Sequence, residues 1–175
     1  YMLLYFVIIF CHNAMSRPTF YYDEKPVKAG GVLFYVTIDG KRHYLLRKGK
    51  KHWGDIGGKT EISDKSIMDM LIREVTEETN NVLFDVSHTT DEAKQALSNH
   101  LENTDFNLFY CEKAKYILLR VEVDASVYGL DTSRFGTHES TGKKMSHSFS
   151  WVHSVDLKTI HPRIKYSNFC HSVFK

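Results

Sequence analysis

The feature that most restricts the fold of this chain is an amphipathic segment between Ser63 and Thr79. Its apolar residues recur every three or four positions and so form one face of a helix: Ile67, Met68, Leu71, Ile72 and Val75. Ser63 and Asp64 are good N-terminal caps, so the helix is expected to begin near them. Asn80 and Asn81 are expected to end it, because asparagine tolerates the left-handed conformation of a helix C-terminus. A helix with one apolar face must pack against another layer of structure.

The segments around this helix predict a β-sheet. Gly30–Thr37 and His43–Arg47 are apolar runs on either side of Asp39-Gly40, a dipeptide typical of tight hairpin turns. Phe106–Tyr110 and Tyr116–Val123 are expected to form a second antiparallel pair. Strands on both sides of a strong helix indicate an α/β fold in which helices cover a mixed sheet.

Several further elements are expected. The sequence predicts a short strand at Val82–Val86 and a last strand at Phe149–His153. The capping-box pattern Thr-Thr-Asp-Glu predicts a second helix from Thr89 to about Glu102. Residues 126–146 are expected to be mostly loop, or a loop with a short helix.

Charge and cysteine content exclude some classes of protein. The net charge is +2 with histidines neutral, which is too small by itself to indicate nucleic-acid binding. The three cysteines, Cys11, Cys111 and Cys170, are widely spaced and do not resemble a disulfide framework or a zinc site. The protein is therefore expected in a reducing compartment, the cytoplasm.

The first residues form an uncharged apolar run from Tyr1 to Cys11. This run is shorter than the ~20 residues of a membrane-spanning helix and lacks the basic flank of a secretory signal. It is either the remnant of a truncated signal or anchor, or upstream sequence translated ahead of a start at Met15. The second interpretation is favoured, because Met15 opens an ordinary soluble sequence. Residues 1–14 are then an extension, residues 15–175 one domain, and no membrane partner is expected.

Three glutamates crowd the end of the predicted helix. Glu74, Glu77 and Glu78 are spaced i, i+3 and i+4, so their carboxylates share one side of the helix. Like charges at this spacing destabilise a helix by about 0.2–0.5 kcal/mol, and acids at a helix C-terminus oppose its dipole. Arg73 can pair with Glu77, but one cation does not neutralise three anions. A hard divalent cation such as Mg²⁺ would do so; the alternative is a solvated acidic face.

The segment Gly58–Val82 resembles the Nudix box. That motif reads Gly, five residues, Glu, seven residues, Arg-Glu, an aliphatic residue, any residue, Glu-Glu, any residue, Gly and an aliphatic residue. Its Arg-Glu to Glu-Glu half is matched in register by residues 73–78. There are three departures: Asp64 replaces the first Glu, eight residues separate it from Arg73, and Asn80-Asn81 replaces the closing Gly-aliphatic pair. None of them removes a carboxylate from the cluster.

The resemblance implies an α/β/α sandwich with a mixed β-sheet and hydrolysis of a phosphoanhydride bond in a nucleoside diphosphate linked to another moiety. It implies Mg²⁺, with Mn²⁺ as the alternative cofactor. The principal metal ligands that it implies are Glu74 and Glu78, and a backbone carbonyl of the Gly57-Gly58 pair, assigned to Gly58, adds a further ligand. Glu77 would either complete the metal cluster or act in catalysis by holding a metal-bound water. Arg73 would orient the glutamates by salt bridging.

The remaining roles concern the substrate and the attacking water. That water needs a base, for which Glu139 is the first candidate and Glu61 the second. Arg47, Gly57 and Lys59 are the candidate substrate-binding residues, although basic side chains here also suit the solvated end of a hairpin.

Two other functions stay open. A non-catalytic Nudix-like module would bind nucleotides or proteins, but it has no need to keep the three glutamates together. An mRNA decapping enzyme would share the chemistry and needs an RNA-binding surface, for which the basic stretch Arg47–Lys51 is a candidate. A small nucleotide substrate is favoured over RNA.

Overall fold

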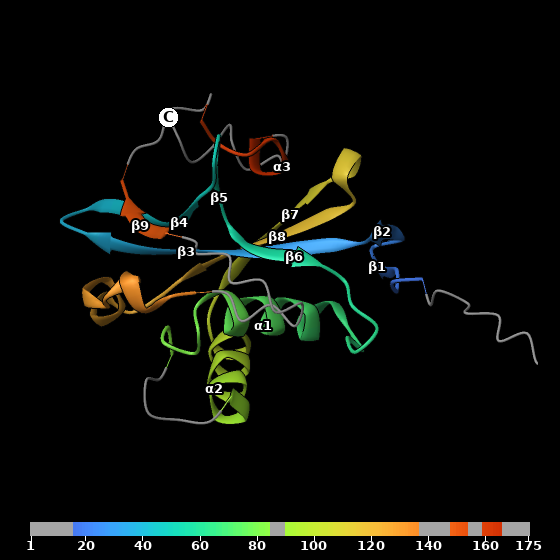
Figure 1. Ribbon diagram of the computed structural model, residues 1–175, viewed down its shortest axis with the longest axis horizontal. Helices are drawn as coiled ribbons and strands as arrows, with labels where there is room; N and C mark the ends of the chain where they lie inside the picture. The colour runs from blue at the N-terminus through green and yellow to red at the C-terminus, as the bar shows by residue number, and fades with distance from the viewer. Residues whose placement is uncertain (1–15, 85–89, 137–147, 154–158, 166–175) are drawn as a thin grey trace, which may run out of the picture.

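The computed structural model describes residues 16–84, 90–136, 148–153 and 159–165, which form a mixed β-sheet with helices on its two faces (Figure 1). The strands are β1 (Phe20–Tyr22), β2 (Lys25–Val27), β3 (Ala29–Ile38), β4 (Lys41–Lys48), β5 (Trp53–Gly54), β6 (Ile56–Lys59), β7 (Phe106–Cys111), β8 (Tyr116–Glu122) and β9 (Ser148–Val152). The α-helices are α1 (Ile67–Glu78), α2 (Thr90–Asn103) and α3 (Pro162–Lys165). Short 3₁₀ turns are η1 (Glu112–Ala114), η2 (Ala125–Gly129) and η3 (Thr132–Arg134).

The main sheet has the strand order β5-β4-β3-β8-β7, with β6 paired to β3 and β9 paired to β4. The pairing of β3 with β8 is parallel, and the other pairings are antiparallel. Helices α1 and α2 lie on one side of the sheet and the single turn α3 on the other (Figure 1). The expected α/β architecture with a mixed sheet between helices is confirmed.

Strand β3 is buried on both faces, which fixes its central position. Val32, Phe34 and Val36 belong to the core beneath α1, whereas Leu33 belongs to a second core that includes Ile164 of α3. A strand that is covered on both faces reads as a continuous apolar run, as residues 30–37 do.

The hairpin between β3 and β4 is confirmed. Asp39 and Gly40 have φ angles of 50° and 71°. Two successive positive φ values are what a tight turn of this kind requires, and they match the twist of the two strands.

The start of α1 differs from the prediction. The helix begins at Ile67, and its N-cap is Ser66, whose hydroxyl accepts a hydrogen bond from the amide of Asp69. Asp64 does not cap the helix, because its carboxylate accepts hydrogen bonds from the Glu61 amide and the Arg73 guanidinium. The prediction of a start near Ser63 or Asp64 was therefore wrong by about one helical turn.

The end of α1 is as predicted, since Asn80 and Asn81 have φ angles of 53° and 61°. The strand predicted at Val82–Val86 is wrong in its described part, where residues 81–84 form turns. Val82 and Leu83 are apolar because they are buried against the core, and not because they pair with a strand. Residues 85 and 86 lie outside the described residues.

Most other elements match their predictions within a few residues: α2, β7, β8 and β9. The sequence did not predict the β1–β2 hairpin, and it gave no structure to the segment that contains α3. None of the described helices is long and apolar enough to cross a lipid bilayer. The division at Met15 concerns residues outside the described part and stays a prediction.

Candidate active site

A surface cavity of about 300 Å³ opens between the C-terminal half of α1 and strand β6. Its lining combines acidic, basic and glycine residues from four segments of the chain: Arg17, Arg47, Gly57, Gly58, Lys59, Glu61, Arg73, Glu74, Glu77 and Glu78. Every candidate site residue that lies within the described part of the chain therefore lines this one cavity. Glu139, the first candidate for the base, lies outside the described residues.

The glycine pair lets β6 lie close to its neighbours. Gly57 and Gly58 pair with Gly31 and Gly30 of β3. A Cβ atom on Gly57 would collide with the backbone of Gly30 and Gly31, whereas a Cβ atom on Gly58 would collide with the carboxylate of Glu74. The absence of a side chain at Gly58 is therefore what allows the Glu74 carboxylate to reach β6.

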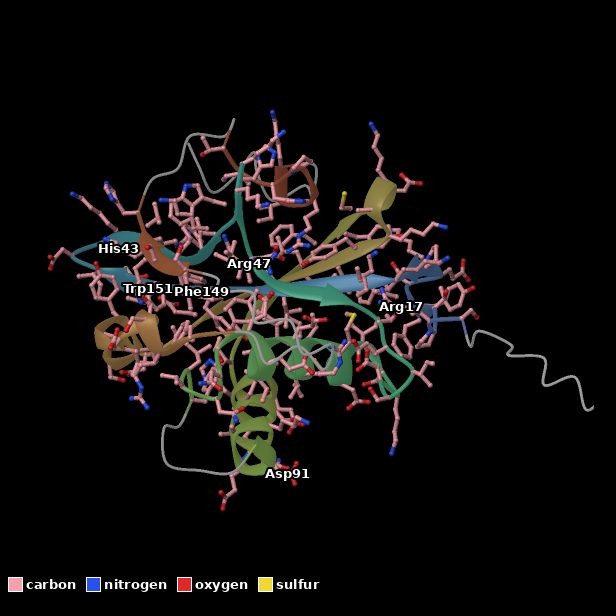
Figure 2. The ribbon with its side chains drawn as sticks, in the orientation of Figure 1. Arg17, His43, Arg47, Asp91, Phe149 and Trp151 are labelled. Carbon is pink, nitrogen blue, oxygen red and sulfur yellow. The ribbon has the colours of Figure 1, made fainter. Side chains whose placement is uncertain are left out.

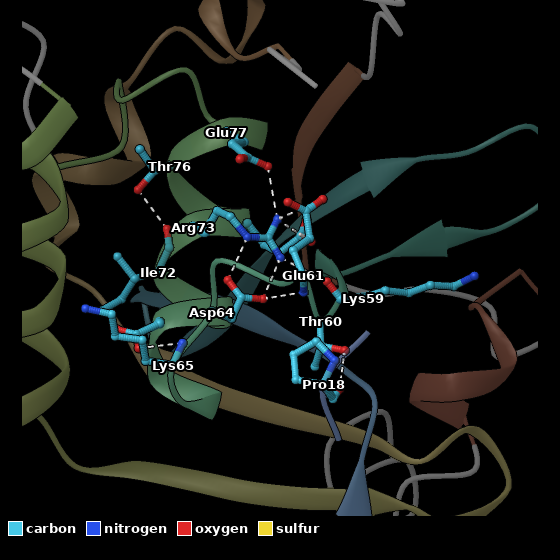
Figure 3. Close-up of polar contacts among 12 residues, drawn as sticks. Pro18, Lys59, Thr60, Glu61, Asp64, Lys65, Ile72, Arg73, Thr76 and Glu77 are labelled. Carbon is cyan, nitrogen blue, oxygen red and sulfur yellow. Dashed lines mark hydrogen bonds and ion pairs between the residues drawn. The ribbon is translucent and has the colours of Figure 1, made fainter. Parts of the chain in front are cut away.

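The Arg73 guanidinium contacts several of the acids that surround it (Figure 3). Its Nη1 donates hydrogen bonds to Glu74 Oε1 at 3.0 Å and to Glu77 Oε2 at 3.2 Å. Its Nε and Nη2 donate to the two oxygens of Asp64 at 2.9 and 3.1 Å, and Nη2 also donates to the Lys59 carbonyl at 2.9 Å. The Arg73 side chain is only 11% exposed, so this is a partly buried network and not an ordinary surface ion pair.

Asp64 explains one departure from the Nudix box. Its side chain is 2% exposed, and its paired oxygens face the guanidinium of Arg73 in a bidentate arrangement. Asp64 therefore holds Arg73 from the loop that precedes α1.

Glu78 is the most deeply buried of the three glutamates, at 5% exposure. It forms an ion pair with Arg47 of β4, and its Oε2 accepts a hydrogen bond from the Gly57 amide at 3.2 Å. These contacts tie the end of α1 to β4 and β6 at the wall of the cavity.

Burial makes the acids of the cluster weak. Desolvation raises the pKa of Glu74 to about 7 and the pKa of Glu78 to about 8, although Arg73 and Arg47 respectively oppose these shifts. Burial also raises the pKa of Glu77. These carboxylates are short of compensating positive charge, which a proton or a cation can supply.

The donor set suits a hard divalent cation. Carboxylate and carbonyl oxygens are the ligands that Mg²⁺ takes, and Mg²⁺ commonly uses only one or two carboxylates while it keeps several waters. Within the described residues, no three His, Cys, Asp or Glu side chains are already arranged around one point. The carboxylates of Glu74 and Glu78 instead pair with Arg73 and Arg47.

Beneath the cavity lies a buried polar network that the sequence did not predict. Asp55 is fully buried; its Oδ1 accepts hydrogen bonds from Arg163 of α3 at 2.7 and 2.9 Å. The hydroxyl of Tyr116 donates to the other Asp55 oxygen at 2.6 Å, and the Arg163 guanidinium lies 4.6 Å from the centre of the Tyr116 ring. Asp55 comes two residues before Gly57, so the network supports the strand that forms the cavity floor.

The chain has matches among solved protein structures. No protein-family model matches it, and no curated protein sequence matches it. The Ap4A hydrolase of C. elegans is similar at 20% identity and a TM-score of 0.35, over 83% of this chain and 89% of that chain. A binary complex of the C. elegans Ap4A hydrolase gives 19% identity and a TM-score of 0.37, over 83% and 88% of the two chains. At these identities and TM-scores, the similarity does not define the function of this chain.

Proposed function

We propose that this protein hydrolyses a phosphoanhydride bond in a small-molecule substrate that contains a nucleoside diphosphate linked to another moiety. The observation that carries the proposal is the meeting of Glu74, Glu77 and Glu78 with the Gly57-Gly58 backbone at one cavity. These residues belong to the segment that resembles the Nudix box, and their buried carboxylates lack sufficient positive charge.

The cofactor of the proposed reaction is Mg²⁺, with Mn²⁺ as the alternative. When bound, such an ion neutralises phosphate charge and polarises phosphorus for in-line attack by water. Glu74 and Glu78 would hold it, with Glu77 and the Gly58 carbonyl as further ligands.

The other residues of the cavity act on the substrate and on the glutamates. Arg73 keeps Glu74 and Glu77 in place by hydrogen bonds to both. Arg47 and Lys59 line the cavity as cations that suit phosphate oxygens. Glu61 lines it too, with 42% of its side chain exposed, and so it is accessible to the attacking water as a base.

The decisive experiment is a hydrolysis assay over a panel of substrates with Mg²⁺ and, separately, with Mn²⁺. The panel contains ADP-ribose, nucleotide sugars, dinucleoside polyphosphates, nucleoside triphosphates and capped RNA. Glu78→Gln keeps the shape of the side chain but removes its charge, and it is expected to lower kcat/KM by on the order of 10²-fold or more. The matched control is Glu102→Gln, which removes an exposed acid from α2 and is expected to match the wild type.

Two results would contradict the proposal. Nucleotide binding without turnover of any compound would favour the non-catalytic module, and equal activity of Glu78→Gln and the wild type would place the chemistry elsewhere. Turnover of capped RNA alone would favour the decapping enzyme.

A further inference from the structure

The cavity has a basic residue that lies far outside the Nudix-like segment. Arg17, labelled in Figure 2, comes from the stretch before β1. It nevertheless lines the cavity together with Arg47 and the glutamates of α1. The sequence gave no reason to connect Arg17 with the Nudix-like segment, which begins at Gly58, because nothing in the local pattern marks it.

A buried hydrogen bond holds this stretch in place. The hydroxyl of Thr60 donates to the carbonyl of Pro18 at 2.7 Å (Figure 3). Thr60 is 1% exposed and directly follows the last residue of β6, so the bond ties the stretch to the strand that forms the cavity floor. The Thr60 amide donates to the Lys28 carbonyl at 3.1 Å, which fixes Thr60 itself.

The neighbouring proline limits the freedom of Arg17. The ring of Pro18 fixes its own φ angle, and it also disfavours helical backbone for the residue before it. Arg17 therefore starts from a restricted, extended backbone, which reduces the conformational entropy that it loses when it binds a ligand.

The charges of the cavity show what Arg17 can do there. Arg73 and Arg47 already pair with carboxylates of the cluster, so less of their charge is available to a substrate than that of Lys59 and Arg17, which also line the cavity. Within the described part of the chain, no hydrogen bond or ion pair holds the side chain of Arg17, which is exposed. A cavity rich in carboxylates repels an anionic substrate, so affinity for phosphate depends on cations that the glutamates do not already neutralise.

We propose that Arg17 is a phosphate-binding residue of this site. Its planar guanidinium donates two hydrogen bonds to non-bridging oxygens of the pyrophosphate group, and the Thr60–Pro18 bond presents it there. This inference rests on the proposed function, because it names a further residue for the substrate of the same cavity.

The first test is steady-state kinetics on the best substrate of the panel. Arg17→Gln is expected to raise KM by about 5- to 20-fold, with a smaller change in kcat, because a charge-assisted hydrogen bond to phosphate is lost. Arg17→Lys keeps the charge and recovers part of this loss. The control Arg42→Gln removes an exposed arginine from the β3–β4 hairpin, outside the cavity, and leaves KM unchanged.

The second test asks whether Thr60 positions Arg17 for the substrate or only stabilises the fold. Thr60→Val removes the hydroxyl with little change of shape and is expected to raise KM because Arg17 is no longer held. The double variant Arg17→Gln/Thr60→Val should then have a KM no higher than Arg17→Gln alone, since both changes remove one interaction. Independent effects, in which the two increases multiply, would overturn the presenting role of Thr60.

A binding measurement distinguishes failure of this inference from failure of the proposed function. Titration calorimetry with methylenebisphosphonate and Mg²⁺ uses a pyrophosphate analogue that is not hydrolysed. If the wild type binds it and Arg17→Gln binds at least about five times more weakly, the inference holds even if no nucleotide is turned over. If both bind equally, or if the wild type does not bind, the inference is wrong, whatever the hydrolysis assay shows.

Discussion

Gly57 and Gly58 are adjacent in β6, but a side chain at each would meet a different kind of neighbour. At Gly58, an added Cβ meets the far end of the flexible Glu74 side chain. Gly58→Ala is therefore expected to displace this carboxylate and to lower kcat/KM by about 10- to 10²-fold. The free energy of unfolding should change by about 1 kcal/mol or less, because a side-chain end moves more easily than backbone.

Gly57→Ala is the matched comparison. Its Cβ meets the backbone of Gly30 and Gly31, so β6 must move away from β3. The expected loss of stability is about 1–3 kcal/mol or more, measured by urea denaturation of both variants. Equal losses of stability, or full activity of Gly58→Ala, would show that Glu74 does not need its place against β6.

At the scale of the element, the N-terminus of α1 gives a second prediction. Ser66→Ala removes the hydroxyl that accepts a hydrogen bond from the Asp69 amide at 3.0 Å, and it should cost about 1 kcal/mol of stability. Ser63→Ala, at the exposed position expected from the sequence, should change stability by about 0.5 kcal/mol or less. Chemical denaturation measures both, and the reverse order of effects would refute the observed cap.

Local patterns were sufficient to predict the elements whose causes are local. The turn Asp39-Gly40 and the helix-ending pair Asn80-Asn81 depend on backbone preferences of these residues themselves, and both are observed. The start of α1 was not predictable in this way. Asp64 is a residue type that often caps helices, but here its carboxylate accepts a hydrogen bond from Arg73, nine positions away. Val82 similarly is a residue type common in strands, but here it is a buried residue of a turn.

In the candidate site, too, residues defined by a local pattern were predicted, and residues defined by distant contacts were not. The glutamates and Arg73 were found because helical spacing brings them together within six residues. Arg17, Asp55 and Arg163 could not be found, because their significance comes from contacts between segments that lie far apart in the sequence. Only the fold brings these segments together.

At the scale of the whole molecule, α3 is attached to the sheet through the Asp55 network. Arg163→Ala leaves the fully buried carboxylate of Asp55 without its cation, so the expected loss of stability is about 3–5 kcal/mol. Tyr116→Phe removes one hydrogen bond and should cost about 1–3 kcal/mol. Lys41→Ala, at the exposed start of β4, is the control for a general loss of charge. Urea denaturation measures all three, and similar small effects throughout would show that the network contributes little.

The whole protein should also respond to its proposed cofactor. A ligand at 100 times its Kd stabilises the folded state by about 2.7 kcal/mol, which for a chain of this size raises Tm by roughly 5–10 °C. Mg²⁺ is expected to produce such a rise in the wild type, measured by calorimetry. Glu78→Gln should show a much smaller rise, whereas an equal rise in both would place the ion elsewhere.

The ion pair between Asp55 and Arg163 spans 108 positions of the chain. During translation, at about 5–20 residues per second, the ribosome therefore makes Arg163 roughly 5–20 s after Asp55. Until then Asp55 has no cation to compensate for its burial. The native position of β6, the strand that follows it, is therefore not yet stabilised by the ion pair. The cavity lined by Gly57 and Gly58 is therefore expected to be completed only after Arg163 has been synthesised.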